Sequence, residues 1–292
     1  MNPPARTGLG ILFLVLATAC FAVLDTSVKV VGASVSVLVA VCFRYVFQAL
    51  AVSVVMLPMR GRTLWQTRQL RWQLVRGALL LGVSLLSFLS VQWMPVGEFT
   101  ALVMTTPLLV TLLAALFLHE SVSPLRWSLV FGGFVGALLI VRPGEALLGW
   151  ISLLPLLMVV SYALFQLLTA RLARTEDPMT MHFYTGWVGA LVSLMILPLV
   201  WQGVPDPRTL ALLCLVGLMG TVGHFLLILA FARTPASTLS PFLYTQIAFA
   251  TACGWWVFGH LPDRWAVLGI VLIVACGVGA SWLTAREKRL PS

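Results

Sequence analysis

Hydrophobic residues along the chain form long runs that are bounded by charged residues, proline or glycine. The run from Phe99 to Leu118 contains no charged residue and has the length, roughly 20 residues, that a helix needs to cross a bilayer. Similar runs recur, and the connections between them are too short to hold a soluble domain. They predict ten transmembrane helices over residues 8–31, 36–58, 72–92, 97–118, 124–141, 147–170, 179–201, 208–231, 236–258 and 264–284. We therefore expect an all-α polytopic membrane protein.

Several residues recur at one fixed distance, which indicates an internal duplication. The matching pairs, each 140 residues apart, are Pro58 with Pro198, Pro95 with Pro235, Thr105 with Thr245 and Glu120 with His260. Because each half contains five predicted helices, an odd number, the second half must start on the opposite side of the membrane. The sequence predicts two inverted five-helix repeats, residues 1–145 and 146–292, an architecture typical of transporters whose substrate site lies near the midplane.

Composition and charge support a membrane setting. Hydrophobic residues make up 60% of the chain and charged residues 9%, with a mean hydropathy of +1.02, so a soluble core could not bury this much apolar surface. The net charge of +9 comes mainly from lysines and arginines between the apolar runs, which gives no reason to expect a nucleic-acid partner. One set of alternate connections carries thirteen of them, including Arg76, and the other set only Arg142, Arg208 and Arg264. The positive-inside rule therefore places the richer side, with both termini, in the cytoplasm.

Three charged residues lie inside predicted spans on the outer side: Asp25, Lys29 and Arg44. Asp25 and Arg44 are expected at similar depths. A charge at membrane depth costs about 2.5 to 3.5 kcal/mol on insertion scales, so each should face a partner or water. Asp25 and Lys29 are four residues apart and share a helix face. Two readings stay open: a structural salt bridge between Asp25 and Arg44, or a polar vestibule that binds substrate.

The centres of the fourth and ninth spans carry hydroxyl and amide groups. Thr105 and Thr106 precede Pro107, which frees a backbone carbonyl in mid-membrane, and Thr245 and Gln246 occupy the corresponding place in the second repeat. Their symmetric position predicts that they line the substrate site, although hydrogen bonds between helices would explain them too.

Other candidates are single polar or aromatic residues within the spans. Four tyrosines and one glutamine could line the path by stacking on a planar ligand or by hydrogen bonding: Tyr45, Tyr162, Tyr184, Tyr244 and Gln166. His224 and Glu98 are candidates for proton coupling, because one titrates near neutral pH and the other opens the fourth span. Packing, interfacial or merely exposed roles would account equally for these residues.

Several motifs carry a family resemblance. They are Arg44 in the second span, the Thr-Thr-Pro centre of the fourth, the sequence LFLHE at 116–120 and the sequence LLIVRPG at 138–144. With the two five-helix halves, they resemble the EamA type of the drug/metabolite transporter superfamily over nearly the whole chain. The pattern LDTSVK at 24–29, followed by Phe-Arg-Tyr at 43–45, is further similar to a bacterial branch that includes riboflavin and S-adenosylmethionine transporters. The second half departs from the pattern at Gly259-His260, where many members have Gly-Glu, so no role is carried over there.

Function follows by elimination and by this resemblance. The chain lacks the GxxxxGK[ST] motif of an ATPase and the HExxH and GxSxG motifs of hydrolases, and Asp25 has no second intramembrane carboxylate with which to form a dyad. We expect a secondary transporter of a small polar or zwitterionic metabolite, such as an amino acid, S-adenosylmethionine or a riboflavin-like molecule, in the bacterial inner membrane. The alternative is an intramembrane enzyme acting on a lipid-linked or peptide substrate.

Neither a catalytic residue, a metal ion nor a cofactor is expected. The five cysteines lie in apolar runs without metal-ligand spacing, which indicates reduced packing residues. Small residues four apart, Gly132 with Gly136 and Ala275 with Gly279, indicate either tight helix packing or a homodimer surface. The expected partners are therefore a small-molecule substrate, the lipid bilayer and a second copy of the chain.

The charge asymmetry predicts which loops are outside. In a cysteine-free background, a cysteine at position 66 (Gln66) should be protected from a membrane-impermeant thiol reagent, and one at position 206 (Asp206) should react. Labelling of intact cells followed by mass shift on a gel measures both. The reverse pattern would overturn the topology.

Overall fold

A computed structural model describes residues 3–93, 102–141, 153–201, 203–259 and 263–287. Each of the ten predicted spans contains helix within these ranges, in which no strand occurs. The elements are α1 Pro3–Val31, α2 Val37–Arg60, the short 3₁₀ helix η1 Gly61–Trp65, α3 Leu70–Trp93, α5 Thr106–Phe117, α6 Pro124–Val141, α7 Leu153–Leu172, α8 Pro178–Val200, α9 Pro207–Phe231, α10 Ala236–Leu243, α11 Thr245–Phe258 and α12 Arg264–Glu287.

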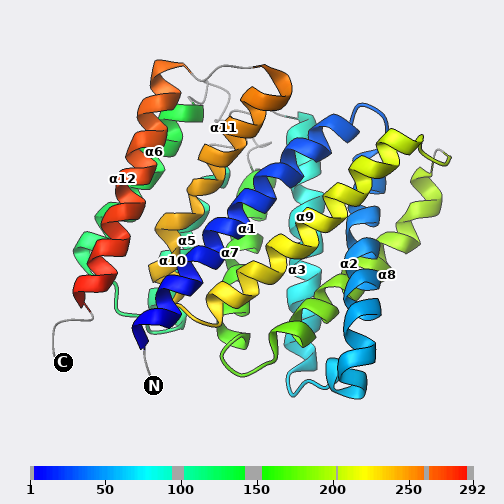
Figure 1. Cartoon of the computed structure of the whole chain (residues 1–292), viewed down its shortest axis with the longest axis horizontal. Coiled ribbons are helices and arrows are strands. Elements are labelled where there is room, and N and C mark those ends of the chain that lie inside the picture. The colour runs from blue at the N-terminus through cyan, green and yellow to red at the C-terminus, as the bar shows by residue number, and fades with distance from the viewer. Residues whose placement is uncertain (1–2, 94–101, 142–152, 202, 260–262, 288–292) are drawn as a thin grey trace.

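The apolar character of these helices confirms the all-α polytopic fold. Within the described ranges six helices, α1, α2, α7, α8, α9 and α12, are long and apolar enough to cross a membrane, and α5 and α6 are shorter apolar helices. The start of α1 and the end of α12 lie at the same end of the molecule (Figure 1). We call this the basic end, because the basic connections of the sequence lie there.

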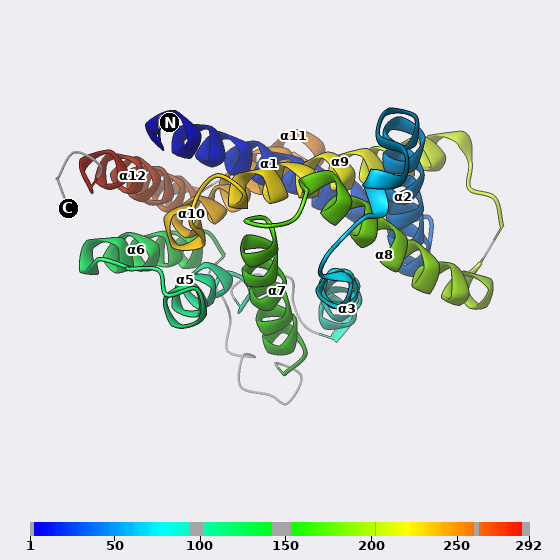
Figure 2. The ribbon, with the colours of Figure 1, turned by 90° about the horizontal axis from the view of Figure 1, so that it is seen from below.

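Helices of the two repeats pack against each other in matching pairs. The first span, α1, packs along α9, and its counterpart in the second repeat, α7, packs along α3. The helix α2 packs along its own counterpart α8, and α6 along α12. Seen from below, α6, α5, α7 and α3 form one layer, and α12, α10, α1, α9 and α2 lie across it (Figure 2). This exchange of partners agrees with two inverted repeats. The predicted boundary between residues 145 and 146 lies outside the described residues.

The fourth and ninth spans are not continuous helices at their centres. The sequence predicted a disturbance of the backbone at Pro107 in the fourth span. α10 ends and α11 begins at Tyr244, and α5 begins after Thr105. In each span a threonine hydroxyl donates to the carbonyl three residues earlier: Thr105 Oγ1 to Leu102 O at 2.7 Å and Thr245 Oγ1 to Phe242 O at 2.6 Å. These two bonds lie 140 residues apart, so the repeat extends to atomic detail.

A proline accompanies each interruption, but at a different place. Pro107 follows the interruption in the fourth span, whereas Pro241 precedes the one in the ninth. Proline lacks the N–H that would bond the carbonyl four residues earlier, so either position weakens the helix at this depth. The sequence identified only the first of these prolines as a cause.

Small residues bring α6 and α12 close together. A Cβ atom on Gly269 would lie 2.4 Å from the Gly136 carbonyl oxygen, and one on Gly132 would lie 2.8 Å from the Cys276 sulfur. The tight packing predicted for the small residues of α6 is thus made within one chain. The homodimer stays a prediction.

Ion pairs at the basic end join the two repeats. Within the described part of the chain, each pair has one member in either repeat: Arg60 with Asp177 at 2.8 Å, Arg126 with Glu287 at 2.5 Å and Arg174 with Glu120 at 2.9 Å. Glu120 also accepts hydrogen bonds from the backbone N–H groups of Ala236 (3.3 Å) and Ser237 (2.9 Å). It therefore caps α10, whose own N-cap residue, Pro235, has no side-chain bond to offer.

The cap on α10 yields a stability prediction. Glu120→Ala should lower the free energy of unfolding by about 1 to 3 kcal/mol, because two backbone donors and the guanidinium of Arg174 lose a largely buried carboxylate. Glu120→Gln, which keeps one acceptor, should cost less. Thermal unfolding in detergent measures both. Equal stability of wild type and Glu120→Ala would contradict the capping role.

Candidate functional site

The carboxylate of Asp25 in the first span is hydrogen-bonded to the interrupted ninth span. Asp25 on α1 is exposed, and its Oδ2 accepts a hydrogen bond of 2.9 Å from Nε2 of Gln246, the second residue of α11. Seven residues earlier on α1, the hydroxyl of Thr18 lies 2.8 Å from that of Thr245. Two polar contacts thus connect the first span to the ninth, between the repeats. The sequence predicted that Thr245 and Gln246 converge with Thr105 and Thr106 of the fourth span on the substrate, and that stays a prediction.

Arg44 is buried on α2 and bonds to a neutral partner. Its Nη2 donates to the Ser84 hydroxyl on α3 at 2.9 Å, and its guanidinium carbon lies 3.9 Å from the centre of the Tyr45 ring. Among the described residues Arg44 forms no salt bridge, so the structural Asp25–Arg44 pair considered from the sequence is not made. Ser84 and the tyrosine ring hold the guanidinium away from the carboxylate.

Lys29 takes no part in an ion pair with Asp25 in the described structure, although the two share a helix face. Its Nζ lies 4.8 Å from the centre of the Phe258 ring at the end of α11. The lysine is exposed near the end of α1.

Tyr162 completes the group from the opposite layer. It is half-buried on α7, within electrostatic range of both Asp25 and Arg44. We call Asp25, Arg44, Tyr162 and Gln246 the upper polar cluster. It offers a carboxylate acceptor, a guanidinium donor, a carboxamide and an aromatic hydroxyl, which together suit a ligand with both positive and negative or hydrogen-bonding groups.

The other residues that were predicted to bind substrate have different surroundings. Thr105 bonds its own backbone, and Thr106 is buried with a hydroxyl that has no partner among the described residues. Tyr45 lies beside Arg44: its hydroxyl is 3.3 Å from the Ser84 hydroxyl, and its ring packs against Gly189 on α8, where a Cβ would lie 2.1 Å from it. The residues Thr105 and Thr106 therefore stay candidates for the midplane.

Two of the predicted tyrosines, Tyr244 and Tyr184, make contacts away from the upper polar cluster. Tyr244 is fully buried against α6, where a Cβ on Gly133 would lie 2.5 Å from its ring. Tyr184 donates its hydroxyl to the backbone oxygen of Trp65 at the basic end, at 2.8 Å. The first packs two helices and the second ties α8 to η1, so neither joins the upper polar cluster.

Of the two proton-coupling candidates, one is described. His224 is buried on α9 between two rings, 4.8 Å from Phe21 and 6.0 Å from Phe165 by centroid. Its Nδ1 has no partner among the described residues. Glu98 lies outside the described residues. Proton coupling stays a prediction for both.

The structure adds polar residues that the sequence did not single out. Thr18 and Ser84 complete the contacts above, and Gln48 Nε2 lies 3.2 Å from Nδ1 of His182, joining α2 to α8. Arg76, counted from the sequence as a cation of the cytoplasmic boundary, is fully buried in α3. Its place five residues inside the predicted third span was the signal that could have revealed it.

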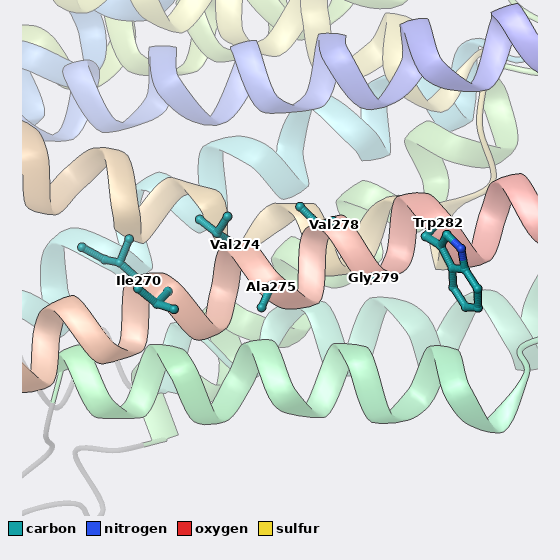
Figure 3. A pocket seen from close by; sticks show the side chains of 7 residues that line it. Ile270, Val274, Ala275, Val278, Gly279 and Trp282 are labelled. Carbon is teal, nitrogen blue, oxygen red and sulfur yellow. The ribbon is translucent and has the colours of Figure 1, made fainter.

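The hollow drawn in Figure 3 differs from the upper polar cluster in that its lining is apolar. It lies along α12 and is lined by apolar or small side chains, with Trp282 at one end. Polar groups that could recognise a metabolite are absent from this lining, so the hollow belongs to the apolar surface of the bundle.

Comparison with known proteins settles the family. The EamA-like transporter family matches the sequence twice, over residues 8–142 and 149–281. The chain belongs to this family. A solved crystal structure superposes with a TM-score of 0.81 at 16% identity, covering 98% of this chain and 99% of the other, which shows the shared fold.

Named relatives of this EamA-like chain are transporters. A riboflavin transporter from Rhizobium johnstonii is 30% identical over 99% of this chain and 96% of its own length. An S-adenosylmethionine uptake transporter from Rickettsia bellii is 27% identical over 94% of both chains, and a pseudopaline exporter from Pseudomonas aeruginosa is 28% identical over 93% and 95%.

These findings confirm the predicted function class. The EamA-like protein is a multi-pass membrane transporter of a small metabolite, and the resemblance stated from its motifs is correct. The intramembrane enzyme gains no support from them. The substrate-binding residues stay predictions, since only their geometry is known.

The contact between Asp25 and Gln246 predicts energetic coupling. Asp25→Asn and Gln246→Leu should each lower the stability of the EamA-like protein by about 1 to 3 kcal/mol, because each leaves a polar partner unsatisfied. The double variant should cost less than the sum by about 0.5 kcal/mol or more. Denaturant unfolding in mixed micelles measures the cycle. The cycle of Asp25→Asn with Tyr184→Phe is the control and should be nearly additive, because the Tyr184 hydroxyl bonds the backbone of Trp65 at the basic end. Strict additivity for Asp25 and Gln246 would contradict the coupling.

Proposed function

We propose that the protein is a secondary transporter that moves a small polar or zwitterionic metabolite across the bacterial inner membrane by alternating access, with both termini in the cytoplasm. The observation that carries this proposal is the hydrogen bond between Asp25 and Gln246, which places an exposed carboxylate against an interrupted helix between the repeats. In inverted-repeat transporters this is the position where substrate binds.

The chemistry of the upper polar cluster supports a ligand of mixed charge. Asp25 and Arg44 bear opposite charges at similar depth, yet each bonds a neutral side chain. Both can therefore exchange these partners for a ligand without breaking a mutual ion pair. Riboflavin and S-adenosylmethionine, named in the relatives, are polar heteroaromatic molecules that such groups and the Tyr162 ring would accommodate.

The described ion pairs support a conformation closed at the basic end. They join the repeats through Arg60, Arg126 and Arg174 at that end, whereas Asp25 is exposed nearer the other end. Rocking one repeat against the other would break the ion pairs at the basic end, open that end and close the end nearer Asp25. We infer that the energy comes from a solute or ion gradient, because the sequence contains no ATPase motif.

Transport is tested in proteoliposomes with radiolabelled S-adenosylmethionine and riboflavin. Wild type should take up at least one of them with saturable kinetics, and Asp25→Asn should lower kcat/KM about tenfold or more, equivalent to roughly 1.4 kcal/mol. Thr26→Val is the matched control, since the neighbouring Thr26 hydroxyl bonds only the backbone of its own helix at Ala22. It should stay within about twofold of wild type.

The outcomes separate the parts of the proposal. Saturable uptake that is insensitive to Asp25→Asn would move the substrate site away from the upper polar cluster. No uptake of either compound by folded protein would remove the two proposed substrates.

A further inference from the structure

Arg76 occupies an unusual position in the bundle. It lies on α3, six residues from the helix start at Leu70, and its side chain is fully buried. Its guanidinium donates to three oxygens from two other helices: the Thr169 hydroxyl on α7 at 3.3 Å, the Thr185 hydroxyl on α8 at 2.5 Å and the backbone oxygen of Met181. The centre of the Phe165 ring lies 5.4 Å from its guanidinium carbon.

The partners of Arg76 are all neutral. Across the described ranges no carboxylate lies within salt-bridge distance of it, and its Nε has no hydrogen-bond partner. A buried guanidinium without a counter-charge is costly, because its hydration has been lost and neutral oxygens replace only part of it. The position therefore calls for an anion.

Two carboxamides near Arg76 are also unsatisfied. Gln73 lies one turn before it on α3, and Gln166 lies one turn before its partner Thr169 on α7. Both side chains are fully buried, and neither the nitrogen nor the oxygen of either amide has a partner among the described residues. Side chains three apart share a helix face, so these amides flank the guanidinium along the α3–α7 contact.

Polar residues on α7 lead from the upper polar cluster to this place. Tyr162, Gln166 and Thr169 follow the spacing i, i+4, i+7 and thus lie on one face of the helix. Seven residues of helix span about 10 Å, so Tyr162 and Thr169, the hydrogen-bond partner of Arg76, are separated by about this distance along α7. This face of α7 therefore runs from the upper polar cluster, which contains the exposed Asp25, to the buried Arg76 nearer the basic end.

We propose that Arg76, with Gln73, Gln166 and Thr169, forms a second subsite that binds an oxyanion of the transported metabolite, a carboxylate or a phosphate. The guanidinium supplies the charge and a paired N–H geometry, and the two carboxamides supply neutral donors. The subsite is covered in this conformation and takes the anion when the basic end opens. It rests on the proposed transport function and narrows it to metabolites with an anionic group. S-adenosylmethionine, which has a carboxylate, fits better than riboflavin, which is uncharged at neutral pH.

An anion titration of the full-length protein tests the subsite without any metabolite. The protein is purified in a maltoside detergent, which has no phosphate headgroup, and its thermal unfolding is followed in sodium phosphate, sodium acetate and sodium chloride at equal ionic strength. Wild type should show a saturable rise in Tm with phosphate or acetate over chloride, because a ligand of the folded state stabilises it. Arg76→Gln should abolish the rise.

Two further variants guard against a purely structural effect. Arg71→Gln, an exposed arginine one turn away on the same helix, is the matched control and should keep the full rise. Gln166→Leu removes an unpartnered buried amide, so a structural role predicts unchanged or higher stability with the same anion response. The subsite instead predicts that Gln166→Leu weakens the apparent anion affinity about fivefold or more.

The results decide between the sources of the anion and between the two proposals. No rise with either anion in wild type, or an equal rise in Arg76→Gln, would overturn the subsite. Excess phosphate should compete with uptake of S-adenosylmethionine if the metabolite uses the same place; uptake that is unaffected would show a site for free anions only and overturn the metabolite assignment. Because the titration contains no metabolite, a positive result stands even if neither proposed substrate is transported.

Discussion

A backbone carbonyl that loses its helical partner inside a bilayer must find another donor within the protein, and this constraint governs the centre of the structure. In the fourth and ninth spans a threonine hydroxyl three residues later, at Thr105 and Thr245, is one such donor, beside a backbone N–H in each case. Such interrupted helices cannot face lipid. They pack on α7 and on α1 respectively, and so bring polar groups of both repeats toward the middle of the bundle.

The same requirement explains where the intramembrane charges lie. Asp25 and Arg44 sit on the inner sides of α1 and α2 with neutral partners, Gln246 and Ser84. Arg76 lies deeper toward the basic end with three neutral oxygens around it. Charges held by neutral groups are better suited to binding a ligand than charges that neutralise each other, since the ligand does not have to replace an ion pair. The polar face of α7 joins the two depths.

At the basic end, by contrast, charged side chains pair with opposite charges. Arg60, Arg126 and Arg174 pair with carboxylates of the opposite repeat. These sites border water, where an ion pair is easily broken and remade. The bond network around Glu120 has a further role, because it holds the start of α10 and thereby the lower half of an interrupted span. Glu120 thus takes part both in an ion pair between the repeats and in the cap of α10.

Much of this architecture follows from the sequence alone. Ten apolar runs and the spacing of 140 residues predict the helical spans and the inverted repeat, because hydrocarbon thickness acts on each segment separately. Motifs such as LFLHE at 116–120 and LLIVRPG at 138–144 indicate the family. The sequence also singled out Thr245 and Gln246 through their symmetric position, although it did not show that they contact the first span.

What only the tertiary structure decided is the choice of partners. Local sequence could not show that Asp25 bonds Gln246 and not Arg44, that Tyr244 turns toward α6, or that Arg76 is buried among α3, α7 and α8. The rotation of each helix about its axis selects these contacts, and that rotation is set by packing against helices distant in the chain. A charge near a span end looks the same in sequence whether it reaches water or the interior, and only the neighbouring helices distinguish the two.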